Sequence, residues 1–387
     1  MSFYTTPLQF GYFFSLLIWL LLLIRGYREQ RLSDRMLGWI MFILAMELQD
    51  YTFGFAGINF LWSELNGFPR SVSLLFGPMV YFYFLAQTNR SFQLKRSHLW
   101  HFLPYGVYFV FRMAFFVQGP DEVEKLNASM VDTVFTYVFR AGLIVSFSYY
   151  LSKCLAIYKK YRTWSQEQYS NLDLIDFKWF RNFIYCMIFW LVFRELMMIL
   201  DVLITLDFYQ DWWWNLGLVA VILYIGLEGF AQKQLSRIDF APDSNTVIQD
   251  VPIRENSTLP PSSESVDLEK LALSDRLGEL MLMERLYVQP ELSLQELSQH
   301  LQTNPVQLSA TINQVLGKNF NDYINGLRID EFIQKYRADR ARRYTLLSLA
   351  LDSGFNSKAT FNRAFKKIKG SSPQEYLDKA KGEHPEE

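Results

Sequence analysis

The order of apolar and polar positions divides the chain into two unlike parts. Through residues 1–237, apolar runs recur that are long enough, as helices, to cross the ~30 Å hydrocarbon core of a bilayer. We expect spans at residues 8–24, 36–58, 72–86, 99–117, 133–152, 183–204 and 212–231. Buried helices of a soluble protein are the alternative, but soluble cores rarely contain such uninterrupted runs. The pattern predicts an all-α chain that begins with a seven-helix transmembrane bundle. Gly77-Pro78 predicts a kink in the third of these spans.

The sequence changes character after residue 237. Lys233–Arg237 is expected to continue the last helix into water. Residues 238–266 then combine prolines with small polar residues and show no periodicity, which is typical of a flexible linker. Helical spacing resumes at Leu268. We therefore predict a transmembrane domain over 1–237, a linker over 238–266 and a helical domain over 267–381.

The helical domain contains an internal repeat. Two pairs of short helices are predicted, at Leu294–Leu301 with Pro305–Leu316 and at Leu346–Ser353 with Lys358–Lys369. One long helix from Asn319 to about Tyr344 connects them. Two similar helix pairs on a shared spacer predict a double helix-turn-helix domain.

Capping residues support these boundaries. Ser293 and Glu296 have the spacing of a capping box, and Asn304 precedes Pro305 at the first helical position. In the second pair, Gly354 is expected at the turn and Ser357 at the helix start. Each helix pair therefore carries its own start signals.

Charge is uneven along the helical domain. Residues 335–371 contain ten basic and two acidic side chains, whereas residues 267–334 contain five basic and ten acidic ones. A charge run is usually only a solvated face. Here it coincides with a capped helix whose other face carries Phe361, Phe365 and Ile368. A basic face opposite a buried one favours binding to DNA phosphates.

Composition narrows the chemistry. Half of the residues are hydrophobic, and the ten tryptophans all lie between Trp19 and Trp214. The two cysteines and four histidines form no disulfide framework and no metal-ligand spacing, so we expect neither a metal nor a cofactor. No nucleophile–base pair or Gly-rich phosphate loop is present, which argues against an enzyme. The N-terminus has no cleavable signal pattern, and the first span is expected to remain.

Basic residues predict the orientation of the bundle. With the N-terminus outside, the inner loops hold thirteen lysines and arginines, and the outer segments hold only Arg70 and Lys125. Seven crossings from that start place the C-terminal domain in the cytoplasm.

Placing an ionisable side chain inside a membrane span costs several kcal/mol of insertion free energy, so each such residue is expected to have a structural or functional role. These residues are Glu47, Asp50, Arg112, Arg140, Arg194, Glu195 and Asp201. One interpretation is a salt-bridge network that holds the bundle together. The other is a sensor pocket, open to the outside, in which a ligand re-pairs some of these charges; its candidate residues are Glu47, Asp50, Arg112, Arg140, Arg194 and Asp201. Both interpretations can hold at once.

Residues 354–367, GFNSKATFNRAFKK, are followed by Gly370 and by Pro373-Gln374-Glu375-Tyr376. This stretch resembles the C-terminal signature of the AraC/XylS family of bacterial transcription regulators, and the resemblance covers about residues 270–380. The N-terminal part is similar to membrane-anchored members of the family, through residues 76–83 and 101–104.

The resemblance implies that two recognition helices enter successive major grooves of DNA. Family contacts carried over by position are Val306, Ser309 and Ala310 in the first unit and Lys358, Ala359, Asn362 and Arg363 in the second. The first set departs from the family's polar readers because its side chains are short or apolar. The second unit is therefore expected to read most bases, with Arg363 suited to guanine and Asn362 to adenine. Lys366 and Lys367 are expected at phosphates.

These features predict a one-component transcription regulator in the bacterial cytoplasmic membrane. Its expected partners are double-stranded DNA, the lipid bilayer and an unknown ligand from the outer side. A receptor or transporter whose C-terminal domain binds a protein is the alternative. Binding by a monomer and by a homodimer both stay open. A flexible linker cannot transmit a rigid displacement of the last span. We therefore expect signalling through pairing or spacing of two chains, or through release of the helical domain from the inner loops.

The orientation is tested by reporter fusions after Asn127 and after Arg237. The uneven distribution of basic residues predicts that the first fusion reports the outside and the second the cytoplasm. The same compartment at both positions would contradict the predicted topology.

Overall fold

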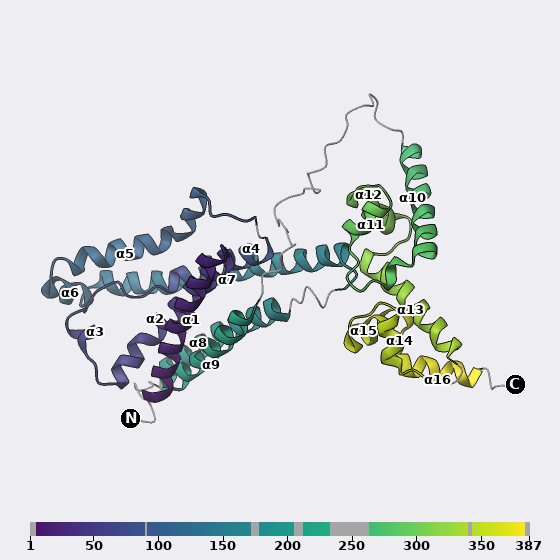
Figure 1. Cartoon of the computed structure of the whole chain (residues 1–387). Helices are drawn as coiled ribbons and strands as arrows, with labels where there is room; N and C mark the ends of the chain where they lie inside the picture. The colour runs from purple at the N-terminus through teal and green to yellow at the C-terminus, as the bar shows by residue number, and fades with distance from the viewer. Residues whose placement is uncertain are drawn as a thin grey trace. The chain divides into compact units, whose positions relative to one another are not determined.

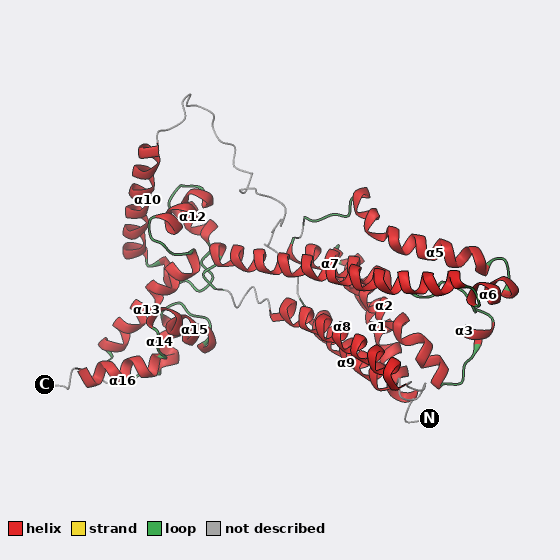
Figure 2. Cartoon of the chain, turned by 180° about the vertical axis from the view of Figure 1, so that it is seen from behind, coloured by secondary structure: helices red, strands yellow, loops and turns green. Residues whose placement is uncertain are grey.

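The structure is a computed structural model, and it describes residues 5–89, 91–171, 178–204, 212–232, 263–339 and 343–383. These residues form helices and connecting segments without a strand, as Figure 2 shows; Tyr169 and Ser293 form an isolated antiparallel β-bridge. The chain divides into two compact units. The first contains residues 1–160 and 177–242, and the second contains 161–176 and 243–387.

The first unit contains a helix at each position where a span is expected (Figure 1). Its helices are α1 (Thr5–Arg28), α2 (Leu32–Phe55), α3 (Phe60–Ser63), η1 (Ser73–Leu75), α4 (Phe76–Thr88), η2 (Arg96–Phe102), α5 (Leu103–Phe116), α6 (Pro120–Asn127), α7 (Met130–Gln168), α8 (Lys178–Ile204) and α9 (Trp212–Ala231). Within the described residues, α1, α7, α8 and α9 are long and apolar enough to cross a membrane. The seven-span count is therefore not confirmed. Helices α4 and α5 have only 13 and 14 residues.

The kink predicted at Gly77-Pro78 is wrong. Helix α4 begins at Phe76, directly after the 3₁₀ turn η1, so Pro78 lies in its first turn. A proline is accommodated there because the first N–H groups of a helix have no partner within the helix. Gly77 permits close packing instead, since a Cβ at this position would lie 2.6 Å from the Tyr150 ring.

Helices α1, α2 and α9 of the first unit pack closely against one another. A Cβ at Gly11 of α1 would lie 2.7 Å from Val219 of α9, and one at Gly229 of α9 would lie 2.7 Å from Leu37 of α2. Small residues thus let the three helices approach closely, as is usual in membrane bundles. At one end, Arg25 pairs with Asp34 at 2.7 Å.

The second unit contains short helices at the positions of the two predicted pairs. Its helices are the end of α7, α10 (Ser263–Glu284), η4 (Leu286–Val288), α11 (Leu294–His300), α12 (Pro305–Gln314), α13 (Phe320–Ala338), α14 (Leu346–Asp352), α15 (Lys358–Lys369) and α16 (Pro373–Glu383). The predicted connecting helix is too long, because α13 ends at Ala338. The predicted helical extension Lys233–Arg237 and nearly all of the predicted linker lie outside the described residues.

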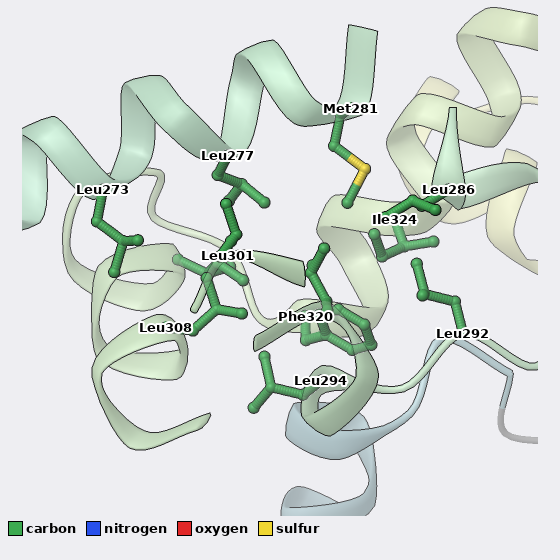
Figure 3. Close-up of a cluster of buried hydrophobic side chains, with 12 residues drawn as sticks. Leu273, Leu277, Met281, Leu286, Leu292, Leu294, Leu301, Leu308, Phe320 and Ile324 are labelled. Carbon is green, nitrogen blue, oxygen red and sulfur yellow. The ribbon is translucent and has the colours of Figure 1, made fainter. Parts of the chain in front are cut away.

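Helix α13 contributes to two hydrophobic cores. The first combines its N-terminal half with α10, α11 and α12, and Figure 3 shows Leu277 and Met281 of α10 directed toward Leu301 and Phe320. The second combines its C-terminal half with α14, α15 and α16. There the ring of Phe332 lies 4.6 Å from that of Phe361. Each helix pair thus has its own core on one shared helix.

The predicted caps are confirmed. Ser293, Asn304 and Ser357 accept hydrogen bonds from the backbone N–H three residues ahead. Gly354 has a φ of 98°, and a Cβ there would lie 2.6 Å from the Tyr287 carbonyl oxygen, so no other residue fits without displacement. The turn of the second pair is therefore packed directly against η4.

Two charged side chains of α13 are buried near η4. Arg328 is 1% exposed, and its Nε and Nη2 donate to the carbonyls of Tyr287 and Gln289, each at 2.7 Å. Burial lowers the pKa of Arg328 to about 10. Glu331 is 4% exposed and pairs with Arg285 and Lys335. Burial alone would raise the pKa of Glu331, but these cations and the Tyr287 hydroxyl lower it overall.

A lowered pKa means that Glu331 stabilises the fold above its ordinary titration range and loses this contribution as the pH falls through the lowered value. Glu331→Gln should therefore reduce stability at pH 7 by about 1–3 kcal/mol, because Arg285 loses its partner. The deficit should shrink under acidic conditions. Hydrogen exchange of α13, corrected for intrinsic rates, measures both effects.

The control is Glu284→Gln, which removes an exposed carboxylate whose partner is His300. An equal loss of protection in the two variants, or a deficit that does not depend on pH, would argue against this role for Glu331.

Candidate DNA-binding interface and cavities of the first unit

Helix α15 has one buried and one exposed face. Phe361 and Phe365 are buried in the second core. The six DNA contacts predicted on this helix are all exposed and recur at helical spacing: Lys358, Ala359, Asn362, Arg363, Lys366 and Lys367. The Ser357 cap sets where this helix begins, so the cap and the core together direct the six side chains outward.

The C-terminal turn of α15 is tied to α13. Lys367 Nζ lies 2.6 and 2.7 Å from the two carboxylate oxygens of Asp322, and Lys369 Nζ lies 3.0 Å from Asp330. Lys367 therefore positions α15 on α13, a role that the sequence analysis did not assign. Its expected phosphate contact stays a prediction.

Helix α12 presents a poorer reading face. Val306 is 37% exposed, whereas Ser309 and Ala310 are half-buried. Asn313 lies on the same face, is exposed, and donates from Nδ2 to Ser309 Oγ at 3.4 Å. Its spacing of seven residues from Val306 indicates this position, although the sequence analysis did not select it. Its amide can read adenine.

The first unit contains two cavities near the predicted sensor residues. One measures about 430 Å³ and is lined by Glu47, Asp50, Arg70 and Arg112, among others. Asp50 pairs with Arg70 at 3.3 Å, and the Ser73 hydroxyl donates to Glu47. Both carboxylates of this cavity thus already have partners: that of Glu47 lies within the first turn of a predicted span, and that of Asp50 lies just outside it.

The other cavity measures about 330 Å³ and lies among α5, α7 and α8. Arg112, Arg140 and Arg194 line it together with Glu195 and with apolar and aromatic side chains. Arg194 pairs with Glu195 at 2.6 Å. Arg112 pairs with Asp132 of α7 at 2.8 Å. Arg140 has no ion pair within the described part of the chain, so this cavity carries excess positive charge.

The structure therefore brings together five of the six predicted sensor residues. Arg112 and Tyr108 line both cavities, which places the two side by side. Asp201 lines neither of them. Pairing across helices is only partly observed: Arg112 joins α5 to α7, but Arg194 pairs with its neighbour on the same helix. The partners Arg70 and Asp132 were missed because they lie just outside the predicted spans.

Comparison with known proteins identifies the second unit. Residues 297–379 match the family model described as a helix-turn-helix domain, which is of the AraC type. No curated protein and no solved structure matches the chain. Residues 297–379 are thus an AraC-type DNA-binding domain, and this domain is that of a transcription regulator rather than an enzyme.

Arg363→Ala should weaken binding to the specific operator by about 1–3 kcal/mol and binding to random DNA far less, because a base contact is lost. Lys366→Ala should weaken both about equally, because a phosphate contact carries no sequence information. Titration of both DNAs at fixed salt gives the two ratios. Lys366 serves as the control instead of Lys367, whose removal would also break the pair with Asp322. An unchanged specificity ratio for Arg363→Ala would reject α15 as the principal reader.

Proposed function

We propose that the protein is a membrane-bound one-component transcription regulator, in which a ligand from the outer side controls operator binding in the cytoplasm. The observation that carries this proposal is the presence of an AraC-type DNA-binding domain in the same chain as four helices that could cross a membrane. Sequencing of DNA crosslinked to the intact protein, together with membrane fractionation, tests it. Absence of either enriched sites or membrane association would overturn it.

The first unit is proposed to cross the bacterial cytoplasmic membrane seven times, with the N-terminus outside. The uneven distribution of basic residues supports this orientation. Helix α2 has 24 residues, which suffices for a crossing. The shorter α4 is proposed to cross inside the bundle, where neighbouring protein can satisfy backbone groups that lipid cannot. Its buried residues Phe82 and Phe84 support this placement.

The two helix pairs of the second unit are proposed to act as two readers. α12 and α15 occupy equivalent places in the repeat, and Leu308 and Ile312 of α12 are buried as Phe361 and Phe365 of α15 are. Most base recognition is assigned to α15, because its exposed face carries Asn362 and Arg363. The short side chains of α12 fit apolar contacts and close approach to the groove.

The arginine-lined cavity is proposed to be the sensor site. Excess positive charge and aromatic walls suit an organic anion with an apolar part. Such a ligand would compete with Glu195 and Asp132 for the guanidinium groups. It can shift the helices between two arrangements only through different affinities for them, and re-pairing of these charges supplies that difference.

Arg140→Gln tests the sensor site without breaking an ion pair seen in the structure. We expect the variant to insert and to bind operator DNA, but to lose the response of an operator reporter to added carboxylates. Hexanoate, benzoate and dodecanoate are compared with the corresponding alcohols. The wild-type reporter should respond to at least one acid and not to its alcohol.

Arg181→Gln is the matched control, because it removes an exposed guanidinium from α8 away from the cavity. A response of Arg140→Gln equal to that of the wild type would reject this cavity as the sensor. Failure of Arg140→Gln to accumulate in the membrane would show instead that the charge holds the bundle together.

A further inference from the structure

The end of α7 is packed into the DNA-binding unit. Tyr161 and Ser165, one turn apart, are 3% and 1% exposed, and Ser170 is fully buried. Ser170 donates from its backbone N–H and from Oγ to the carbonyl of Leu292, at 3.2 and 2.6 Å. Tyr169 forms the antiparallel bridge with Ser293, the N-cap of α11. The segment therefore joins the first helix pair at its first residue.

The same segment contacts α13. Asn321 Nδ2 donates to the carbonyls of Tyr169 and Ser170, at 3.2 and 2.8 Å. Asn321 Oδ1 also accepts from Asn325 Nδ2, and the side-chain oxygen Oδ1 of Asn325 accepts from Arg328 Nη1 at 3.4 Å. A continuous chain of hydrogen bonds thus runs from the end of α7 along one face of α13.

Arg328 completes this network. Nη1 and Nη2 reach the carbonyl and hydroxyl oxygens of Ser170, at 3.4 and 3.1 Å. The rest of the guanidinium is held by the carbonyls of η4 and the residues after it, and no carboxylate pairs with it in the described part of the chain. Loss of Ser170 would leave a buried cation with fewer acceptors, which is costly.

Arg328 also braces the second helix pair. Its guanidinium carbon lies 5.9 Å from the centre of the Phe355 ring, and its Nε lies 2.9 Å from the position of a Cβ at Gly354. Both residues belong to the turn between α14 and α15. The Arg328 side chain therefore contacts both η4, which precedes the first helix pair, and the turn within the second pair. Ser170 accepts part of the hydrogen bonds that Arg328 donates.

We propose that residues 161–171 are a latch, and that the surface formed by Leu292, Ser293, Asn321 and Arg328 is its docking site. When the latch is docked, Arg328 is fully bonded, and α13 holds the two helix pairs in the spacing that binds the operator. When it is withdrawn, the pairs lose this brace and the operator is bound more weakly, because ordering them costs part of the binding free energy. None of the predicted DNA contacts belongs to the docking site, so docking leaves the reading face uncovered.

The latch rests on the proposed function and adds to it a connection between the arginine-lined cavity and the DNA-binding unit. Helix α7 runs without interruption from Met130 to Gln168. It contributes Arg140 to the cavity and ends immediately before Tyr169. A ligand that displaces α7 at Arg140 thus acts on the latch through one helix.

The test uses full-length protein in membranes with Cys154 and Cys186 replaced by alanine. Tyr169→Cys and Ser293→Cys place two thiols on paired residues of the β-bridge, where Cα separations suit a disulfide. We expect the oxidised protein to bind operator DNA at least as tightly as the reduced protein. In the uncrosslinked chain, Ser170→Val and Asn321→Leu should each weaken operator binding about tenfold and random-DNA binding little. Adding the disulfide to Asn321→Leu should restore the affinity.

Gln299→Ala, an exposed amide on α11, is the matched control and should leave operator binding unchanged. Failure of the disulfide to form, weaker operator binding after oxidation, or wild-type affinity in both latch variants would each overturn the latch. In all three outcomes the reduced protein would still bind its operator at the membrane. Loss of specific binding in the reduced protein itself would reject the proposed function instead.

Discussion

The DNA-binding unit depends on the burial of one guanidinium group, that of Arg328. A buried cation is tolerated only when its donors are satisfied, and here most acceptors are carbonyl and hydroxyl oxygens from two separate parts of the chain, residues 287–290 and Ser170. These acceptors belong to the turn after α10 and to the end of α7, and the guanidinium carbon also lies 5.9 Å from the centre of the Phe355 ring in the turn of the second helix pair. Five donors in a planar group thus hold together segments that have no common secondary structure.

Electrostatic contacts also set how α15 lies on α13. The first half of the domain is acidic and the second is basic, and the pairs of Lys367 with Asp322 and Lys369 with Asp330 join the two halves. These pairs use basic residues near the end of the reading helix. Arg363 and Lys366, earlier in the helix, remain exposed on its outer face. The same charge asymmetry therefore serves both internal positioning and attraction of DNA phosphates.

Local rules predicted much of the second unit. Ser293, Asn304 and Ser357 each start a helix because a short polar side chain satisfies a free backbone N–H, which depends on neighbouring residues alone. The predicted end of α13 is wrong because the Asp339 carboxylate accepts from the N–H groups of Arg343 and Tyr344, and such local bonds compete with a continued helix. Hydropathy located a helix at each expected span, but not the short helices α3 and α6 or the 3₁₀ turns that shorten α4 and α5.

The joint at Arg328 could not be predicted in this way. Ser170 and Arg328 lie 158 positions apart, and each has the pattern of an ordinary polar residue in a helix or loop. Only the folded chain shows that they meet. The candidate cavities were partly predictable, because a charge inside an apolar run needs a partner. The identity of those partners depends on packing between helices, which the sequence alone does not contain.

The uninterrupted helix α7 restricts which insertions and deletions the chain can accept. At 39 residues the helix is about 58 Å long, nearly twice the thickness of a hydrocarbon core. Each residue of a helix advances about 1.5 Å and turns about 100°. One residue inserted between Arg140 and the end of α7 would turn that end by about 100° relative to Arg140, whereas seven would nearly restore its azimuth. Among related chains, α7 should therefore change length in whole-turn steps.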